Sequence, residues 1–318
     1  MKRPYARLGV GLALWFGAAA TTGCAPSNKV KPGQPVMLSF GVVDPTGTPV
    51  ELETEAGPTL VPPLSTLHAV FDRLLDPTGI EDLKDAGPPV GTEGVGVIDW
   101  SGRPVANTGR YIPNGDAKFT LIYPPGPSID VIPSEGLPSD SMLTVALNPE
   151  HVRSHDQTVA FKADDGVADT LTFTTEALAV TIAVPAPEAP DGGTDDDGGT
   201  GDDGGAAPGV APPVASDFAV SITFNNQTAA TTVGAIKVAA TVDGAAVDVT
   251  KAVVARAKDD DDHDIPNIWV VSPPPLADGM PGSWPARAVV TVTVDTTAAD
   301  KFDKTLGAAV TATFTVKP

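Results

Sequence analysis

The sequence is poor in cysteine, in aromatic residues and in basic residues. Its 318 residues include one cysteine, so an internal disulfide is excluded and any domain must be stable without that cross-link. Aromatic residues make up 5% of the chain, which limits its cores to small aliphatic side chains. The formal net charge is -20, and the sequence has no polybasic patch. These features argue against nucleic acid as a partner and against a purely electrostatic attachment to anionic lipids.

The apolar run near the N-terminus is too short to span a bilayer. It covers residues 8–20, LGVGLALWFGAAA, and follows Lys2, Arg3 and Arg7. As a helix it would rise about 20 Å, whereas the hydrocarbon core of a bilayer is about 30 Å thick. A basic stretch, a short apolar stretch and a few small residues are typical of a secretory signal. We therefore predict a signal peptide at residues 1–23 and an exported mature chain.

The residues TTGC at positions 21–24 resemble the lipobox of bacterial lipoproteins. The resemblance implies that Cys24 is lipidated, becomes the new N-terminus and holds the protein on a membrane. The residue after Cys24 is Ala25, whereas a lipoprotein kept in the inner membrane would have Asp there. The resemblance therefore implies the outer membrane, where the protein would face the periplasm or the cell surface. Thr21 departs from the pattern, which usually has Leu there. The alternative is cleavage after the AAA of residues 18–20, which would release a soluble secreted protein.

The mature sequence predicts an all-β chain with two domains. It contains 33 prolines and 32 glycines, which favour many turns and short strands. Apolar residues alternate with polar ones in several runs, at 36–42, 119–123, 143–147, 171–173, 222–224, 236–242, 290–294 and 312–316. Residues 24–35 predict a polar tether and residues 183–214 a disordered Gly/Asp/Pro linker, because these segments have almost no large apolar side chains. The predicted domains are 36–182 and 215–318, both immunoglobulin-like β-sandwiches.

The two halves of the chain also resemble each other. Residues 143–159 align without gaps with 290–306, and the closing segment TLTFTT at 170–175 aligns with TATFTV at 311–316. The alignment pairs Thr144 with Thr291, Val145 with Val292, Asp156 with Asp303, and Thr158 with Thr305. Phe71 and Phe224 mark the same early strand in each copy, so the repeat unit is about 100 residues long.

Short motifs in both copies resemble the bacterial immunoglobulin-like domains first described in surface-layer proteins. The first copy carries FDRLLD at 71–76, GLPS at 136–139, LTV at 143–145 and LTFTT at 171–175; the second carries ITF at 222–224, GSWP at 282–285 and TATFT at 311–315. The second copy lacks the RLLD segment. The resemblance implies tandem sandwiches with a structural, adhesive or protein-interaction role.

Few residues suggest catalysis or metal binding. His151 and His155 have the spacing of a zinc pair on a helix, but the Glu of a metalloprotease motif is missing and the segment follows a strand, so a solvated loop is favoured. His68 and His263 have no second histidine or cysteine nearby in the sequence. No G-x-S-x-G motif places a serine nucleophile. An enzyme would have to assemble its site from scattered carboxylates, so an envelope enzyme with a degenerate site remains only a distant alternative.

Calcium is the main alternative to a chain without cofactors. The acidic run at residues 259–264 offers Asp259, Asp261, Asp262 and Asp264 as ligands, but it lacks the Gly and Glu of an EF-hand loop. The tract GGTGDD at 198–203 matches one calcium repeat without tandem copies. A solvated acidic turn is the favoured interpretation of the run at 259–264.

Three tryptophans raise the alternative of a glycan-binding module. Trp100, Trp269 and Trp284 could stack on sugar rings, although packing inside the sandwiches is favoured for all of them. The sequence thus predicts a non-catalytic cell-envelope lipoprotein. Its expected partners are the membrane, through the N-terminal lipid, and an unidentified envelope protein or glycan.

Overall fold

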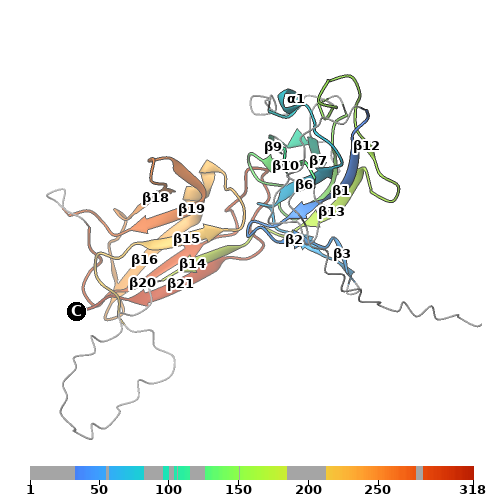
Figure 1. Ribbon diagram of the computed structural model, residues 1–318. Helices are drawn as coiled ribbons and strands as arrows, with labels where there is room; N and C mark the ends of the chain where they lie inside the picture. Colours follow the sequence, from blue (N-terminus) through green and yellow to red (C-terminus); the bar gives the residue numbers. More distant parts are fainter. Residues whose placement is uncertain are drawn as a thin grey trace, which may run out of the picture.

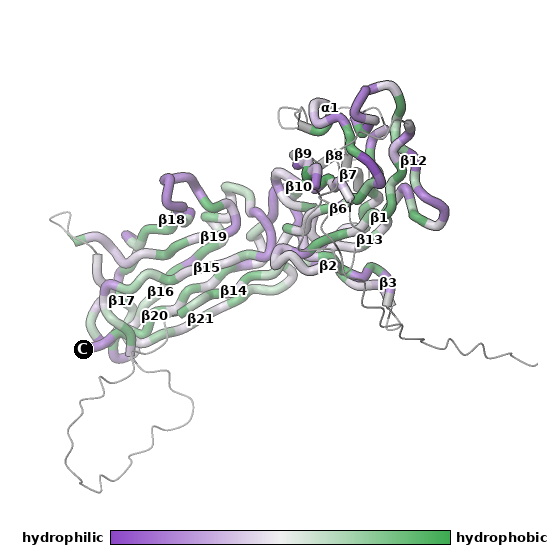
Figure 2. Tube along the Cα trace, viewed as in Figure 1, coloured by the Kyte–Doolittle hydropathy of each residue, from purple (hydrophilic) through white to green (hydrophobic). Residues whose placement is uncertain are grey.

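The computed structural model describes residues 33–54, 57–81, 96–99, 104–105, 107–114, 126–149, 151–184, 213–276 and 282–318. The regular secondary structure of these residues is almost entirely β-strand, and the strands form two sandwiches joined end to end (Figure 1). Hydrophobic and paler residues alternate along the strands, so each sheet turns one side toward a core (Figure 2). The predicted fold class, all-β with two immunoglobulin-like sandwiches, is confirmed.

The C-terminal sandwich consists of two four-stranded sheets, ordered β14-β15-β19-β18 and β17-β16-β20-β21. If its eight strands are lettered A, B, C, C′, D, E, F and G in chain order, the sheets become A-B-E-D and C′-C-F-G. That is the strand order of immunoglobulin-like domains. The strands are β14 (Val180–Ala183), β15 (Val220–Phe224), β16 (Ile236–Val242), β17 (Ala245–Val247), β18 (Val253–Lys258), β19 (Asp264–Ser272), β20 (Val289–Val294) and β21 (Val310–Thr315), with a 3-10 helix at Ala230–Ala235.

The N-terminal sandwich repeats this order and adds strands to it. One sheet runs β12-β1-β6-β10-β9 with β2 paired to β1, and the other runs β5-β13-β11-β7-β8. The strands are β1 (Val36–Val43), β2 (Pro49–Val50), β5 (Leu60–Val61), β6 (Thr66–Phe71), β7 (Gly96–Asp99), β8 (Pro104–Val105), β9 (Asn107–Ile112), β10 (Ser128–Pro133), β11 (Met142–Ala146), β12 (Lys162–Ala163) and β13 (Thr170–Thr175). A small hairpin of β3 (Glu53–Thr54) and β4 (Gly57–Pro58) and the short helix α1 (Pro77–Glu81) complete the described elements.

The internal repeat predicted from the sequence aligns equivalent strands in the correct register. In the N-terminal sandwich Thr144 of β11 lies opposite Thr172 of β13, and in the C-terminal sandwich Thr291 of β20 lies opposite Thr313 of β21. Both threonine pairs have hydroxyls 3.3 Å apart. The correspondence extends to a parallel β-pairing that the chain makes after the first strand of each sandwich. It joins Val61 to Thr175 in the N-terminal sandwich and Val214 to Val316 in the C-terminal sandwich.

The expected boundary at residue 182 is wrong, because residues 178–184 belong to the C-terminal sandwich. β14 pairs with β15, from Val180 opposite Phe224 to Ala183 opposite Ser221. Leu178 is buried in the core of that sandwich together with Val220 and Ile222. The first sandwich therefore ends with β13, before residue 178.

This correction changes what the Gly/Asp-rich segment connects. Residues 185–212 lie outside the described residues, but the chain on both sides of them belongs to the C-terminal sandwich. The segment is an insertion between the first strand, β14, and the parallel contact of Val214 with Val316. The N-terminal sandwich has a shorter insertion at the same place, where β2, β3 and β4 lie between β1 and β5. The expected linker between domains is therefore an insertion within one domain.

Candidate functional site

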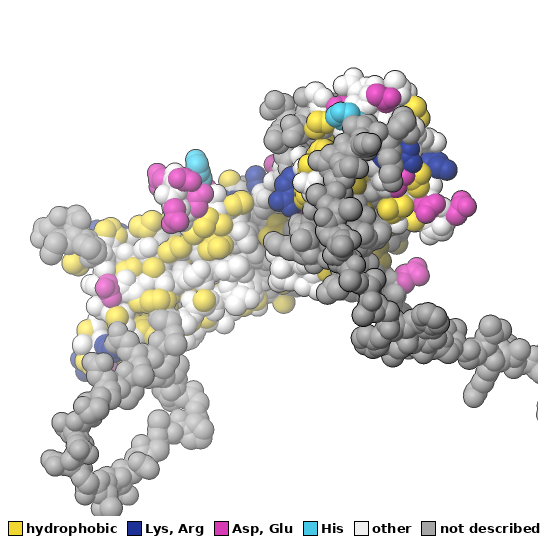
Figure 3. Space-filling model, viewed as in Figure 1, with side chains coloured by type: hydrophobic (Ala, Val, Ile, Leu, Met, Phe, Trp, Pro, Cys, Tyr) yellow, Lys and Arg dark blue, Asp and Glu magenta, His cyan; other side chains and the backbone are white. Residues whose placement is uncertain are grey.

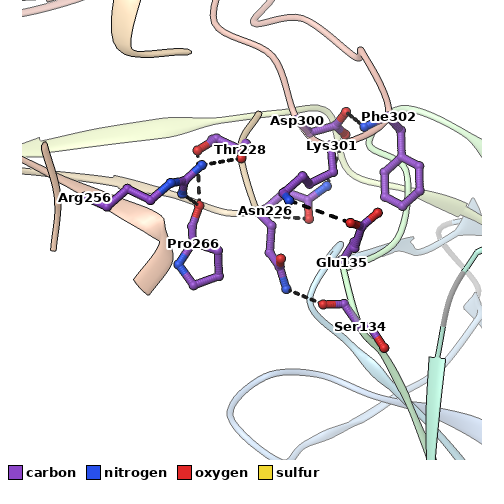
Figure 4. A network of polar contacts seen from close by, with 10 residues as sticks. Ser134, Glu135, Asn226, Thr228, Arg256, Pro266, Asp300, Lys301 and Phe302 are labelled. Carbon is purple, nitrogen blue, oxygen red and sulfur yellow. Dashed lines mark hydrogen bonds and ion pairs between the residues drawn. The ribbon is translucent and has the colours of Figure 1, made fainter. Parts of the chain in front are cut away.

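A network of polar contacts lies at the junction of the two sandwiches (Figure 4). Asp300, in the turn between β20 and β21, is fully buried, and its Oδ2 accepts hydrogen bonds from the backbone N of Ser139 at 2.9 Å and from Nδ2 of Asn226 at 3.1 Å. Nδ2 of Asn226 also donates to the carbonyl O of Leu137 at 2.8 Å and to Oγ of Ser139 at 3.0 Å. Residues of the loop 134–141 thus bond directly to two loops of the C-terminal sandwich.

Local turns hold these side chains in place. Oδ1 of Asp300 accepts from the backbone N of Phe302 at 2.8 Å and of Lys304 at 2.9 Å, which closes the turn between β20 and β21. Oδ1 of Asn226 accepts from the backbone N of Gln227 at 2.8 Å. Each buried polar group of this center therefore has partners, as buried groups require.

An aromatic side chain adds an apolar contact to the junction. Phe302 belongs to the C-terminal chain segment, yet it packs in the core cluster of the N-terminal sandwich. Burying a phenylalanine is worth about 1.5–3 kcal/mol. Next to these residues, Nε2 of Gln227 donates to the carbonyl O of Ser134 at 2.9 Å, and Nζ of Lys301 lies 3.7 Å from Oε1 of Glu135. The ion pair is partly exposed and contributes little.

Arg256 fastens the neighbouring loops of the C-terminal sandwich. Its guanidinium lies 4.5 Å from the center of the Trp269 ring and donates to the carbonyl oxygens of Thr228, at 2.6 Å, and of Pro266. Trp269 in turn donates from Nε1 to Oγ1 of Thr228 at 2.8 Å. These contacts hold the loop that carries Asn226 against the start of β19.

The predicted calcium candidates form the exposed turn between β18 and β19, where acidic side chains gather in Figure 3. Oδ1 of Asp259 accepts from the backbone N of Asp261 at 3.0 Å and of His263 at 2.8 Å. Nζ of Lys258 lies 3.1 Å from Oδ1 of Asp264 and 3.8 Å from Oδ1 of Asp262. In the part of the chain that the structure describes, no group of three or more His, Cys, Asp or Glu residues is arranged to hold a metal ion. The turn is held by its own amides and by a lysine.

Sequence reasoning missed a second polar cluster in the N-terminal sandwich. His68 on β6, Asp130 on β10 and Arg110 on β9 lie opposite one another in neighbouring strands. Nδ1 of His68 lies 2.7 Å from Oδ1 of Asp130, and both side chains are buried. Burial alone would raise the pKa of Asp130, but the contacts with His68 and Arg110 outweigh it and hold that pKa below its usual value. The sequence signal is weak: a histidine in an apolar strand, at a position that alternates with the core residues Leu67 and Ala69.

The other residues singled out from the sequence are spread over the molecule. Trp269 and Trp284 are buried, and Trp284 donates from Nε1 to the carbonyl O of Phe218 at 2.7 Å, so packing is confirmed for both. His151 and His155 lie in a turn and not on a helix. Cys24 and Trp100 lie outside the described residues. Among the helices that the structure describes, none is long and apolar enough to cross a membrane.

Comparisons with known proteins add little to this description. No protein-family model matches the sequence, and no curated protein matches it. A search of solved structures found a chain described as "Anomalous substructure of Titin-A168169", with 9% sequence identity and a TM-score of 0.24. The alignment covers 81% of this chain and 92% of that chain. Because a TM-score this low carries no argument, the fold assignment rests on the strand order alone.

Proposed function

We propose that this protein is a non-catalytic lipoprotein of the bacterial outer membrane, whose immunoglobulin-like sandwiches serve a structural or interaction role. The observation that carries the proposal is the position of the only cysteine. Cys24 directly follows the apolar run and a Gly, where a lipobox places its cysteine. The fold by itself does not fix a function, so the partner has to be found at the surfaces that the sandwiches leave free.

The buried polar groups are consistent with a role without catalysis. Asp300 accepts four N–H groups that hold loops, and Asp130 is held between His68 and Arg110. Such groups stabilise the two sandwiches, and their partners leave little capacity for a substrate. A structural or interaction role requires only a stable frame with exposed surfaces.

The proposed anchor would place the two ends of the molecule at different distances from the membrane. The tether of residues 24–35 can span at most about 40 Å when fully extended. It leads to Val36, whose carbonyl O accepts from the backbone N of Asp72 at 3.0 Å, at the end that carries α1 and β12 (Figure 1). The C-terminal sandwich lies beyond the junction, and Val214 pairs with Val316 at its far end. That far end is the surface we expect to meet an envelope protein or glycan.

Cell fractionation of a Cys24→Ser variant tests the anchor. We expect the variant to move from the membrane fraction to the soluble fraction, because in this proposal the lipid on Cys24 attaches the protein to the membrane and serine cannot carry that lipid. A Ser27→Ala variant changes the tether without touching the lipobox and should stay with the membrane. If the Cys24→Ser variant stays with the membrane, the lipoprotein proposal is wrong.

A further inference from the structure

We propose that the two sandwiches form one rigid body, locked by a buried latch. The latch consists of Asn226, Asp300 and Phe302 of the C-terminal sandwich and the loop 134–141 of the N-terminal sandwich. Neighbouring domains of one chain usually move relative to each other unless their interface is extensive and well packed. The inference goes beyond the proposed function and does not rest on the lipid anchor.

The latch couples three loops that are far apart in the sequence. Asp300 and Asn226 bond to each other and both bond to Ser139, and all three residues are fully buried. Any rotation at the junction would break several of these bonds together, since they share the same atoms. Phe302, two residues after Asp300, is inserted into the core of the N-terminal sandwich and would have to leave it. The latch therefore resists both bending and twisting.

The connection between the sandwiches is also held at each of its ends. It is the short segment 176–179 between β13 and β14. The carbonyl O of Glu176 accepts from the backbone N of Asp140 at 2.9 Å. Asn225 donates from Nδ2 to the carbonyl O of Ala177 at 3.0 Å and accepts at Oδ1 from the backbone N of Ala179 at 2.8 Å. A hinge needs free backbone dihedrals, and these bonds restrict them.

A glycine in the N-terminal loop shows how closely the two sandwiches approach. Gly136 has a φ of +77°, and a Cβ built on it would lie 2.2 Å from Oδ1 of Asn226. Only glycine fits this position, because any other residue would be strained there and would push Asn226 away. The position allows the latch to be opened from the opposite side by a single methyl group.

Distances between two spin labels test whether the sandwiches are locked. The sequence has one cysteine, so a soluble Cys24→Ser chain starts free of labelling sites. Labels at Thr172→Cys and Thr313→Cys occupy equivalent exposed strand positions in the two sandwiches. Pulsed electron paramagnetic resonance then gives the distribution of distances between them. We expect a single narrow distribution for the chain with an intact latch.

Two variants open the latch, and a third is the matched control. Asn226→Ala removes the donor that bonds to Leu137, Ser139 and Asp300, and Gly136→Ala adds the Cβ that collides with Asn226. Both should widen the distribution at least about twofold. Asn267→Ala removes an amide that donates to the carbonyl O of Phe224, a bond within the C-terminal sandwich, and should leave the width unchanged.

The outcomes separate clearly. A broad distribution in the chain with an intact latch would overturn the proposal, and so would a narrow distribution in both Asn226→Ala and Gly136→Ala. Near-ultraviolet circular dichroism of each variant shows whether the cores stay folded. If one of the two variants does not fold, the other decides the question. Widening in either folded variant, with Asn267→Ala unchanged, supports a lock at this junction.

Discussion

Removing β14 should destabilise the C-terminal sandwich severely, although β14 precedes the Gly/Asp-rich insertion. Burial of Leu178 is worth about 1.5–3 kcal/mol, and the half-buried Val180 and Ile182 add about 1 kcal/mol each. The hydrogen bonds of the β14–β15 ladder contribute about 0.5–1.5 kcal/mol each. With about one hydrogen bond for each of the four residue pairs of the ladder, these terms sum to about 5–11 kcal/mol, which is comparable to the total stability of a small domain, about 5–15 kcal/mol.

A pair of fragments measures this contribution. The fragment 177–318 contains β14, and the fragment 214–318 lacks it. Both lack the N-terminal sandwich, and they differ only in β14 and the Gly/Asp-rich insertion that follows it. Chemical denaturation followed by tryptophan fluorescence should show a cooperative transition for 177–318 and none for 214–318. Within the full chain, Leu178→Ala should lower the free energy of unfolding by about 2–4 kcal/mol, and the exposed Ala179→Ser should change it little. Equal cooperativity and midpoints for the two fragments would refute the corrected boundary.

Two further predictions concern exposed carboxylates. Lys237 and Thr297 lower the pKa of Asp295 from 3.8 to about 2, so the stability that Asp295 contributes is present above the unfolded pKa and is lost as the pH falls through the folded one. Between about pH 5 and pH 2, the free energy of unfolding should therefore fall less for the Asp295→Asn variant than for the natural chain. Identical pH profiles of the two would contradict this. The melting temperature of the full chain should be the same in millimolar calcium and in a chelator, because the acidic turn is already held by its own backbone amides and by Lys258. A rise that Asp261→Asn with Asp264→Asn abolishes would instead establish a calcium site there.

The sequence by itself determined the strands and much of their equivalence. Period-two alternation reports which side chains face a core, and this is a local property, so β11, β13, β20 and β21 could be placed from it. The alignment of the two halves made Thr144 equivalent to Thr291 and Thr172 equivalent to Thr313, and the structure pairs these threonines in the same register in both sandwiches. Burial of Trp269 followed from its apolar neighbours in the run IWVV at 268–271, and burial of Trp284 followed from its place just before a predicted strand.

Only the tertiary structure decided which sandwich each segment belongs to and how the sandwiches meet. Composition shows that residues 185–212 are poor in apolar side chains, but it does not show that β14, before them, pairs with β15, after them. Strand pairing is a non-local choice, since any alternating strand can add to several sheet edges. Asn226, Ser139 and Asp300 look like ordinary loop residues in the sequence. They become a buried latch because the fold brings three distant loops to one place, where each side chain satisfies the others.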